Sequence, residues 1–119
     1  LPLTVPEYLE WGDPRNKAEY DCIKSYCPYT NIAACEHPAM LLLTSLEDSQ
    51  VMYWEPVKYA AKLRATGTGK KPLLLKVSSG IGHGGPSGLH DRLKEKAFMQ
   101  SFIISQICSD VAPMKRNAK

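Results

Sequence analysis

The sequence has no long hydrophobic run, and no stretch approaches the roughly 20 consecutive apolar residues that a membrane-spanning helix needs. It also lacks a dense basic stripe. The formal net charge is only +3, and basic residues are adjacent only at Lys70-Lys71 and Lys115-Arg116. A nucleic-acid-binding surface normally concentrates positive charge. We therefore expect neither a membrane span nor a nucleic-acid partner.

A signal peptide is also missing, and the chain starts at Leu1 rather than Met, so we expect a processed or truncated piece. Nothing in the sequence indicates an oxidising compartment, in which disulfides would form. We therefore interpret the cysteines as reduced thiols of a cytoplasmic protein. The cysteines are Cys22, Cys27, Cys35 and Cys108.

Two stretches partly match ligand-binding motifs, but neither matches in full. Three of the cysteines and His37 form the pattern C-x4-C-x7-C-x-H, which lacks the close pairs typical of zinc sites. Residues 67–70 (Gly-Thr-Gly-Lys) resemble the end of a phosphate loop, but Arg64 stands where its first glycine belongs and Lys71 where Ser or Thr belongs. We expect no metal and no cofactor.

What is present fits one globular α/β domain, because 119 residues with 44% apolar and 23% charged side chains are ordinary for that class. Three prolines in residues 1–15 predict an extended segment or loop, and Asn16 is a candidate cap for a helix over 17–26. Residues 39–45 and 73–77 are short apolar runs that predict strands buried on both faces. Residues 51–66, with regular helix starting near Trp54 or Glu55, and residues 89–108 have helical periodicity. Residues 109–119 predict a fraying polar tail.

The apolar positions of these two helices define the faces that we expect to be buried. For 51–66 they are Trp54, Val57, Ala60, Ala61 and Leu63, and for 89–108 they are Leu93, Ala97, Phe98, Phe102, Ile103 and Ile104.

Strand, helix, strand and helix follow one another from residue 39, which predicts parallel strands joined by a crossover helix. Asp48 follows the first strand, and His83 follows the second in a loop with five glycines. Parallel strands end at the same edge of a sheet, so a carboxylate and an imidazole could meet there and form an acid–base pair. The alternatives are a loop carboxylate that caps the next helix and an idle histidine on a glycine-rich surface loop.

Several stretches together resemble the prolyl oligopeptidase family of serine peptidases, and its oligopeptidase B branch in particular. They are residues 46–56 (Leu-Glu-Asp-Ser-Gln-Val-Met-Tyr-Trp-Glu-Pro), 60–64 (Ala-Ala-Lys-Leu-Arg), 82–85 (Gly-His-Gly-Gly) with Ser87-Gly88, 1–4 (Leu-Pro-Leu-Thr), 10–14 (Glu-Trp-Gly-Asp-Pro) and 25–32 (Ser-Tyr-Cys-Pro-Tyr-Thr-Asn-Ile). The resemblance covers residues 1 to about 104.

The resemblance implies an α/β-hydrolase catalytic domain with triad order Ser, Asp, His. Asp48 would be the triad aspartate and His83 the triad histidine. The branch cleaves short peptides after arginine or lysine, and Glu7 matches one of the carboxylates that bind the basic side chain. Leu9 stands where the second such carboxylate is usual. The chain also departs from the family at His37-Pro38 and at Leu89-His90.

The nucleophile motif Gly-x-Ser-x-Gly does not occur in the 119 residues. Ser87 is too close to His83 and is not placed between a strand and a helix, so we do not accept it as a substitute. Two parallel strands would also leave open edges and uncovered apolar faces. We therefore expect an incomplete sheet whose partner is the N-terminal part of the hydrolase domain, in the same precursor or as a second chain.

The resulting expectation is a partial peptidase catalytic domain over residues 1–108, the C-terminal portion of an α/β-hydrolase fold. It would act on short peptide substrates but would be inactive alone. The alternative is a non-catalytic interaction or structural subunit derived from a truncated hydrolase.

Overall fold

The computed structural model describes residues 4–108, and the chain divides into two compact units, one ending at Gly85 and the next beginning at Pro86. The first unit contains α1 (Tyr8–Trp11), α2 (Lys17–Tyr26), β1 (Met40–Ser45), α3 (Trp54–Thr66) and β2 (Leu73–Ser78). The second contains α4 (Leu89–Ile107). The expected polar tail over 109–119 lies outside the described residues.

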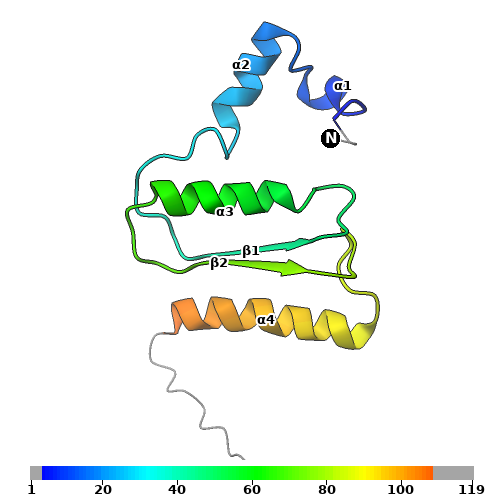
Figure 1. Cartoon of the computed structure of the whole chain (residues 1–119), viewed down its shortest axis with the longest axis vertical. Helices are drawn as coiled ribbons and strands as arrows, with labels where there is room; N and C mark the ends of the chain where they lie inside the picture. Colours follow the sequence, from blue (N-terminus) through cyan, green and yellow to red (C-terminus); the bar gives the residue numbers. More distant parts are fainter. Residues whose placement is uncertain (1–3, 109–119) are drawn as a thin grey trace, which may run out of the picture. The chain divides into compact units, whose positions relative to one another are not determined.

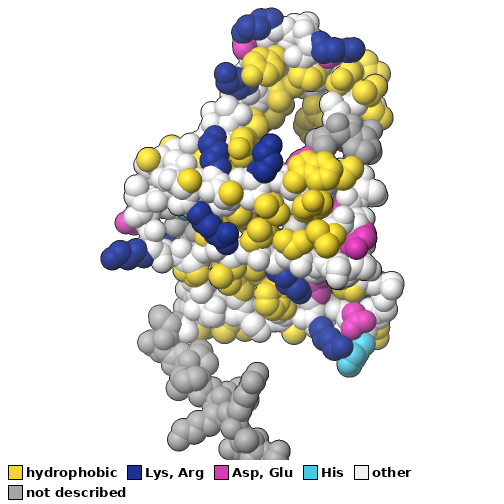
Figure 2. All heavy atoms as spheres, in the orientation of Figure 1, with side chains coloured by type: hydrophobic (Ala, Val, Ile, Leu, Met, Phe, Trp, Pro, Cys, Tyr) yellow, Lys and Arg dark blue, Asp and Glu magenta, His cyan; other side chains and the backbone are white. Residues whose placement is uncertain are grey.

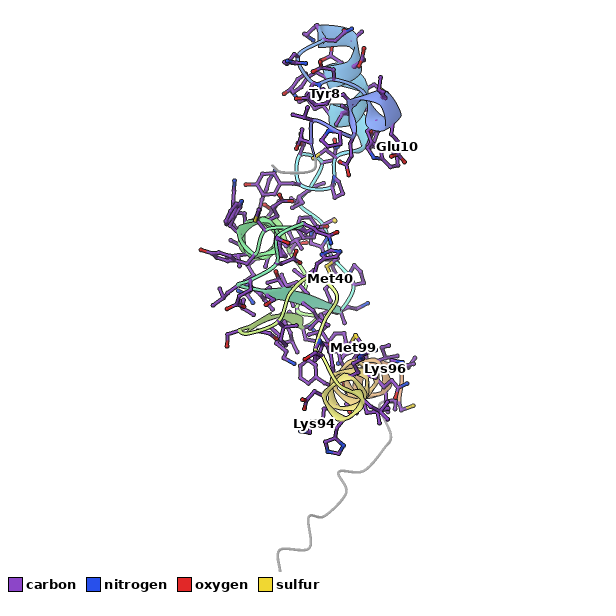
Figure 3. All side chains as sticks on the ribbon, turned by 90° about the vertical axis from the view of Figure 1, so that its right-hand side faces the viewer. Tyr8, Glu10, Met40, Lys94, Lys96 and Met99 are labelled. Atoms are coloured by element: carbon purple, nitrogen blue, oxygen red, sulfur yellow. The ribbon has the colours of Figure 1, made fainter. Side chains whose placement is uncertain are left out.

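β1 and β2 form a parallel two-stranded sheet, with Met40 opposite Leu73 at one end and Ser45 opposite Ser78 at the other. Figure 1 shows the strands side by side and pointing the same way, and Figure 3 labels Met40 where β1 begins. Both predicted strands are confirmed to within a residue of their ends. Because the strands are parallel, the loops that follow Ser45 and Ser78 leave the sheet at the same edge.

The crossover helix α3 packs on both strands and contributes the apolar residues of the first unit that are fully buried, Ala60 and Leu63. Its predicted start is confirmed, since Pro56 is its third residue and a proline is tolerated in the first turn. Burial of one leucine side chain stabilises a fold by about 1.5–3 kcal/mol. The prediction of one continuous buried face was wrong at Trp54 and Ala61, which are exposed.

The strands were also expected to be buried on both faces, and this was wrong in the first unit. Residues 40–44 are half-buried, while Leu74 and Val77 of β2 are 47% and 41% exposed. The physical reason is that a two-stranded sheet has two faces and two edges, and α3 is too small to cover them. On the face of the molecule drawn in Figure 2, hydrophobic side chains reach the surface in the region of α3.

Residues 1–15 contain an element that the sequence did not predict. The short helix α1, on which Figure 3 labels Tyr8 and Glu10, lies inside the segment expected to be extended. Pro6 stands two residues before its first residue, where a fixed φ near −65° is compatible with a turn entering a helix. Gly12, with φ of 100°, ends it.

The helix α2 begins as the sequence predicts. The side chain of Asn16 accepts a hydrogen bond from the backbone N–H of Ala18 at 3.0 Å, which satisfies one of the otherwise unpaired donors of the first turn. The Asn16 amide also donates to Oε1 of Glu19 at 2.9 Å. The cap and its reciprocal acid therefore set the start of this helix.

The second unit consists of α4 and the segment that leads into it, and the predicted helix over 89–108 is confirmed to within one residue. Figure 3 shows side chains around the whole circumference of α4, among them Lys94, Lys96 and Met99. Large apolar side chains of this helix are more than 40% exposed. They are Leu89, Leu93, Phe98, Ile103, Ile104 and Ile107. Among residues 4–108 no helix is both long and apolar enough to cross a membrane.

Candidate active site

Asp48 lies in the loop between β1 and α3, three residues after the last residue of the strand. Its Oδ1 accepts hydrogen bonds from the backbone N–H groups of Gln50 and Val51, both at 2.9 Å. The N-cap position of α3 is Tyr53, which makes no side-chain cap, so Asp48 does not cap the helix. Its bonds instead shape the loop and hold the carboxylate in one orientation.

His83 lies in the loop that follows β2, within a tight turn in which the N–H of Gly85 donates to the carbonyl of Gly82 at 3.1 Å. Gly80 and Gly85 have φ of 71° and 79°, values that favour glycine. A Cβ added at Gly80, Gly82 or Gly84 would meet no atom within 4 Å. The loop is therefore bent by its glycines rather than packed into place by neighbouring side chains.

The two loops bring the predicted acid and base together. The Nδ1 atom of His83 lies 3.0 Å from Oδ2 and 3.1 Å from Oδ1 of Asp48. The Asp48 side chain is 11% exposed and that of His83 is 43% exposed. An ionised carboxylate can only accept hydrogen bonds, so Nδ1 must carry the proton that joins the pair. This leaves Nε2 of His83 as the nitrogen able to take a proton from another group.

Asp48 is held in its ionised form. Partial desolvation acts to raise the pKa of its carboxyl group, but the hydrogen bonds from the N–H groups of Val51 and Gln50 and from His83 outweigh it, and the pKa lies below its ordinary value of 3.8. At neutral pH Asp48 is therefore a carboxylate beside His83, the arrangement that stabilises an imidazolium when His83 accepts a proton.

Two residues that the sequence analysis did not single out lie next to the pair. Oε2 of Glu47 accepts a hydrogen bond from the backbone N–H of Gly80 at 2.8 Å. The hydroxyl of Ser45, which is 6% exposed, is within hydrogen-bond distance of the carbonyl oxygens of Ile81 and Ser78 and of Oε2 of Glu47. The sequence contained a signal for each residue: Ser45 is polar and ends an apolar strand, and Glu47 is an acid directly before Asp48.

The third predicted site residue, Glu7, lies at the N-cap position of α1 and is half-buried. Its backbone carbonyl accepts hydrogen bonds from Glu10 and Trp11. Among residues 4–108 its side chain has no hydrogen bond or ion pair with Asp48 or His83. The structure thus brings two of the three predicted residues together, and the role of Glu7 stays a prediction.

The cysteines and His37 do not gather into a ligand set. Within the described residues no group of three or more His, Cys, Asp or Glu side chains could hold a metal ion, and Cys22, Cys27, Cys35 and Cys108 are free. Cys35 lies 3.7 Å from Nδ1 of His37, but no third ligand joins them.

Parallel strands joined by a helix, with an acid and an imidazole in the two loops at their carboxyl edge, define part of an α/β-hydrolase fold. A profile of the prolyl oligopeptidase family matches residues 1–109, and the chain belongs to that family.

Known proteins similar to the chain agree with this assignment. The chain is 48% identical to dipeptidyl aminopeptidase BI of Pseudoxanthomonas mexicana and 43% identical to protease 2 of Moraxella lacunata, in each case over 90% of the chain. It superimposes on oligopeptidase B from Leishmania major with a TM-score of 0.89 and 35% identity over 98% of its length. These matches cover 15%, 16% and 16% of the three proteins, so the chain spans about one sixth of their length.

Proposed function

We propose that this chain is the segment of a serine oligopeptidase that carries the acid and the base of its catalytic triad. The observation that carries the proposal is the contact of 3.0 Å between Nδ1 of His83 and Oδ2 of Asp48, in a chain of the prolyl oligopeptidase family. In this role His83 accepts the proton of a serine hydroxyl through Nε2 and returns it to the leaving amine. Asp48 orients the imidazole and stabilises its charged form.

The nucleophile has to come from outside these 119 residues, because none of them lies in a Gly-x-Ser-x-Gly sequence. We assign it, with the oxyanion-binding donors, to the N-terminal part of the hydrolase domain, in the same polypeptide or as a second chain. Two observations support such a partner. The chain covers only 15% of dipeptidyl aminopeptidase BI, and apolar side chains of β2 and α4 are exposed. A cytoplasmic location, in which the four cysteines would stay reduced, is part of the proposal.

The proposed substrates are short peptides, cleaved after a basic residue. Glu7 supplies a carboxylate for the arginine or lysine side chain, as charge complementarity requires. Leu9, which is fully exposed, contributes no second carboxylate. The preference for basic residues should therefore be weaker than a pair of carboxylates would give.

The test is reconstitution of the chain with the rest of the hydrolase domain, assayed on an arginyl amide and on the corresponding alanyl amide. We expect hydrolysis that falls by at least about a thousandfold in His83→Ala and in Asp48→Asn. Glu7→Gln should lower kcat/KM about tenfold for the arginyl amide and leave the alanyl amide unchanged. Asp21→Ala, which removes an exposed acid of α2, is the matched control.

Activity that does not depend on His83 would exclude this mechanism. An assembly that forms but hydrolyses neither amide would favour the second candidate, a structural or interaction subunit. The exposed apolar side chains of α4 are the specific observation on which that candidate rests.

A further inference from the structure

The glycine loop that carries His83 presents a physical problem. Gly80, Gly82 and Gly84 have open space around their Cα atoms, so side-chain packing does not immobilise them. Glycine has more backbone freedom than any other residue, and a loop rich in it loses much conformational entropy when it is ordered. Some other interaction has to keep the imidazole at 3.0 Å from the carboxylate.

Two contacts reach the glycine loop, one from Glu47 in the β1–α3 loop and one from Ser45, the last residue of β1. The carboxylate of Glu47 accepts the N–H of Gly80 at 2.8 Å, and the hydroxyl of Ser45 contacts the carbonyl of Ile81. We call these four residues the cross-loop clamp. Its contacts join residues 33 and 36 positions apart, and Asp48 and His83 are 35 positions apart. The clamp and the pair thus connect the same two segments of the chain, residues 45–48 and 80–83.

The clamp has one buried member. Ser45 is buried, and its Oγ has three acceptors around a single hydroxyl hydrogen, while Glu47 and Gly80 are exposed and are joined by the hydrogen bond at 2.8 Å. Glu47 precedes Asp48 in the chain, so the two acids lie in the same loop after β1. Gly80 has φ of 71°, a conformation that other residues adopt at a cost.

We propose that Glu47, with Ser45, is a positioning residue for the acid–base pair: it anchors the glycine loop and so fixes His83 against Asp48. The inference rests on the proposed function for its catalytic consequence, but the positioning itself is a property of this chain. Glu47 does not touch the reacting atoms and acts only through the loop.

The primary experiment follows the Nδ1–H proton of His83 by NMR in the full chain labelled with ¹⁵N-histidine, with the signal assigned by its loss in His83→Gln. In Glu47→Ala we expect its exchange with water to become about tenfold faster, because the pair opens more often. Glu47→Gln keeps an acceptor for the N–H of Gly80 and should exchange within about threefold of the unmodified chain.

A second readout is the kinetics of the reconstituted assembly. Glu47→Ala should lower kcat by about ten- to a hundredfold with little change in KM, whereas simple loss of stability would lower the amount of active protein and leave kcat per active site unchanged. If Glu47→Ala fails to fold, Glu47→Asp withdraws the carboxylate from Gly80 by one methylene and keeps the charge. It should give the same two effects in weaker form.

The two proposals fail separately. An assembly without hydrolysis overturns the proposed function, while the exchange of the Nδ1–H proton still decides the role of Glu47. Unchanged exchange in folded Glu47→Ala or Glu47→Asp overturns the positioning role, even if the assembly hydrolyses peptides through His83. An equal effect from Asp21→Ala would also overturn it, because that acid forms its ion pair with Lys17 of its own helix.

Discussion

At the scale of single residues, the site depends on backbone geometry as much as on the acid and the base. Asp48 is oriented by two backbone N–H groups, and His83 is carried by a loop in which the φ values of Gly80 and Gly85 favour glycine. The side chains of the proposed acid–base pair are thus held in part by backbone atoms. Substitutions that change the backbone should therefore matter as much as those that change the pair.

Gly80 and Gly82 allow this to be tested within one loop. Both have open space where a Cβ would go, but Gly80 has φ of 71° and Gly82 is not among the positive-φ glycines. We expect Gly80→Ala to lower the free energy of unfolding by about 1–2 kcal/mol, because an alanine in the left-handed region is strained. Gly82→Ala, the matched control, should change it by less than about 0.5 kcal/mol. Denaturant unfolding followed by tryptophan fluorescence measures both, and equal effects would contradict the assignment of strain to Gly80.

The lowered pKa of Asp48 gives a pH dependence with a definite sign. The folded state binds its proton less readily than the unfolded chain, so the stabilisation is complete above the ordinary value of 3.8 and is lost as pH falls through the lower folded value. The difference in unfolding free energy between the unmodified chain and Asp48→Asn should therefore shrink as the pH falls below about 4. A difference that stays constant or grows between about pH 4 and about pH 2 would show that the pKa is not lowered.

At the scale of elements, the first unit is held by the packing of α3 on the sheet. Leu63 is 2% exposed, whereas Leu74 on β2 is 47% exposed. Leu63→Ala should destabilise the chain by about 2–5 kcal/mol, because it removes buried contacts and leaves a cavity. Leu74→Ala makes the same chemical change where much of the side chain meets water, and should cost less than about 1 kcal/mol. Urea unfolding of the two variants checks the difference, and similar losses would mean that α3 does not form the core.

The elements also show which sequence signals were reliable. The apolar runs at 39–45 and 73–77 and the cap at Asn16 predicted β1, β2 and the start of α2 closely, because each depends on interactions within a few residues. The short helix α1 was missed, because four residues carry too little periodicity and its prolines suggested an extended segment. More residues were predicted to be buried than the structure buries, since burial depends on which other elements pack against a helix or strand.

At the scale of the whole molecule, the chain buries few apolar side chains. Ala60 and Leu63 are the buried apolar residues of the described part, while large hydrophobic residues of β2 and α4 are exposed. A stable domain of this length normally buries a much larger core. Both the exposed apolar surface and the coverage of about one sixth of the relatives fit the proposal that the chain is part of a larger hydrolase domain.

The sequence by itself determined the order of strands and helices, the family, and the candidate roles of Asp48 and His83, because local patterns and motifs are written in consecutive residues. Only the tertiary structure decided that Nδ1 of His83 faces both oxygens of Asp48, and that Ser45 and Glu47 hold the neighbouring loop. These contacts join residues more than 30 positions apart. They exist because two parallel strands end at one edge, a geometry that no short stretch of sequence contains.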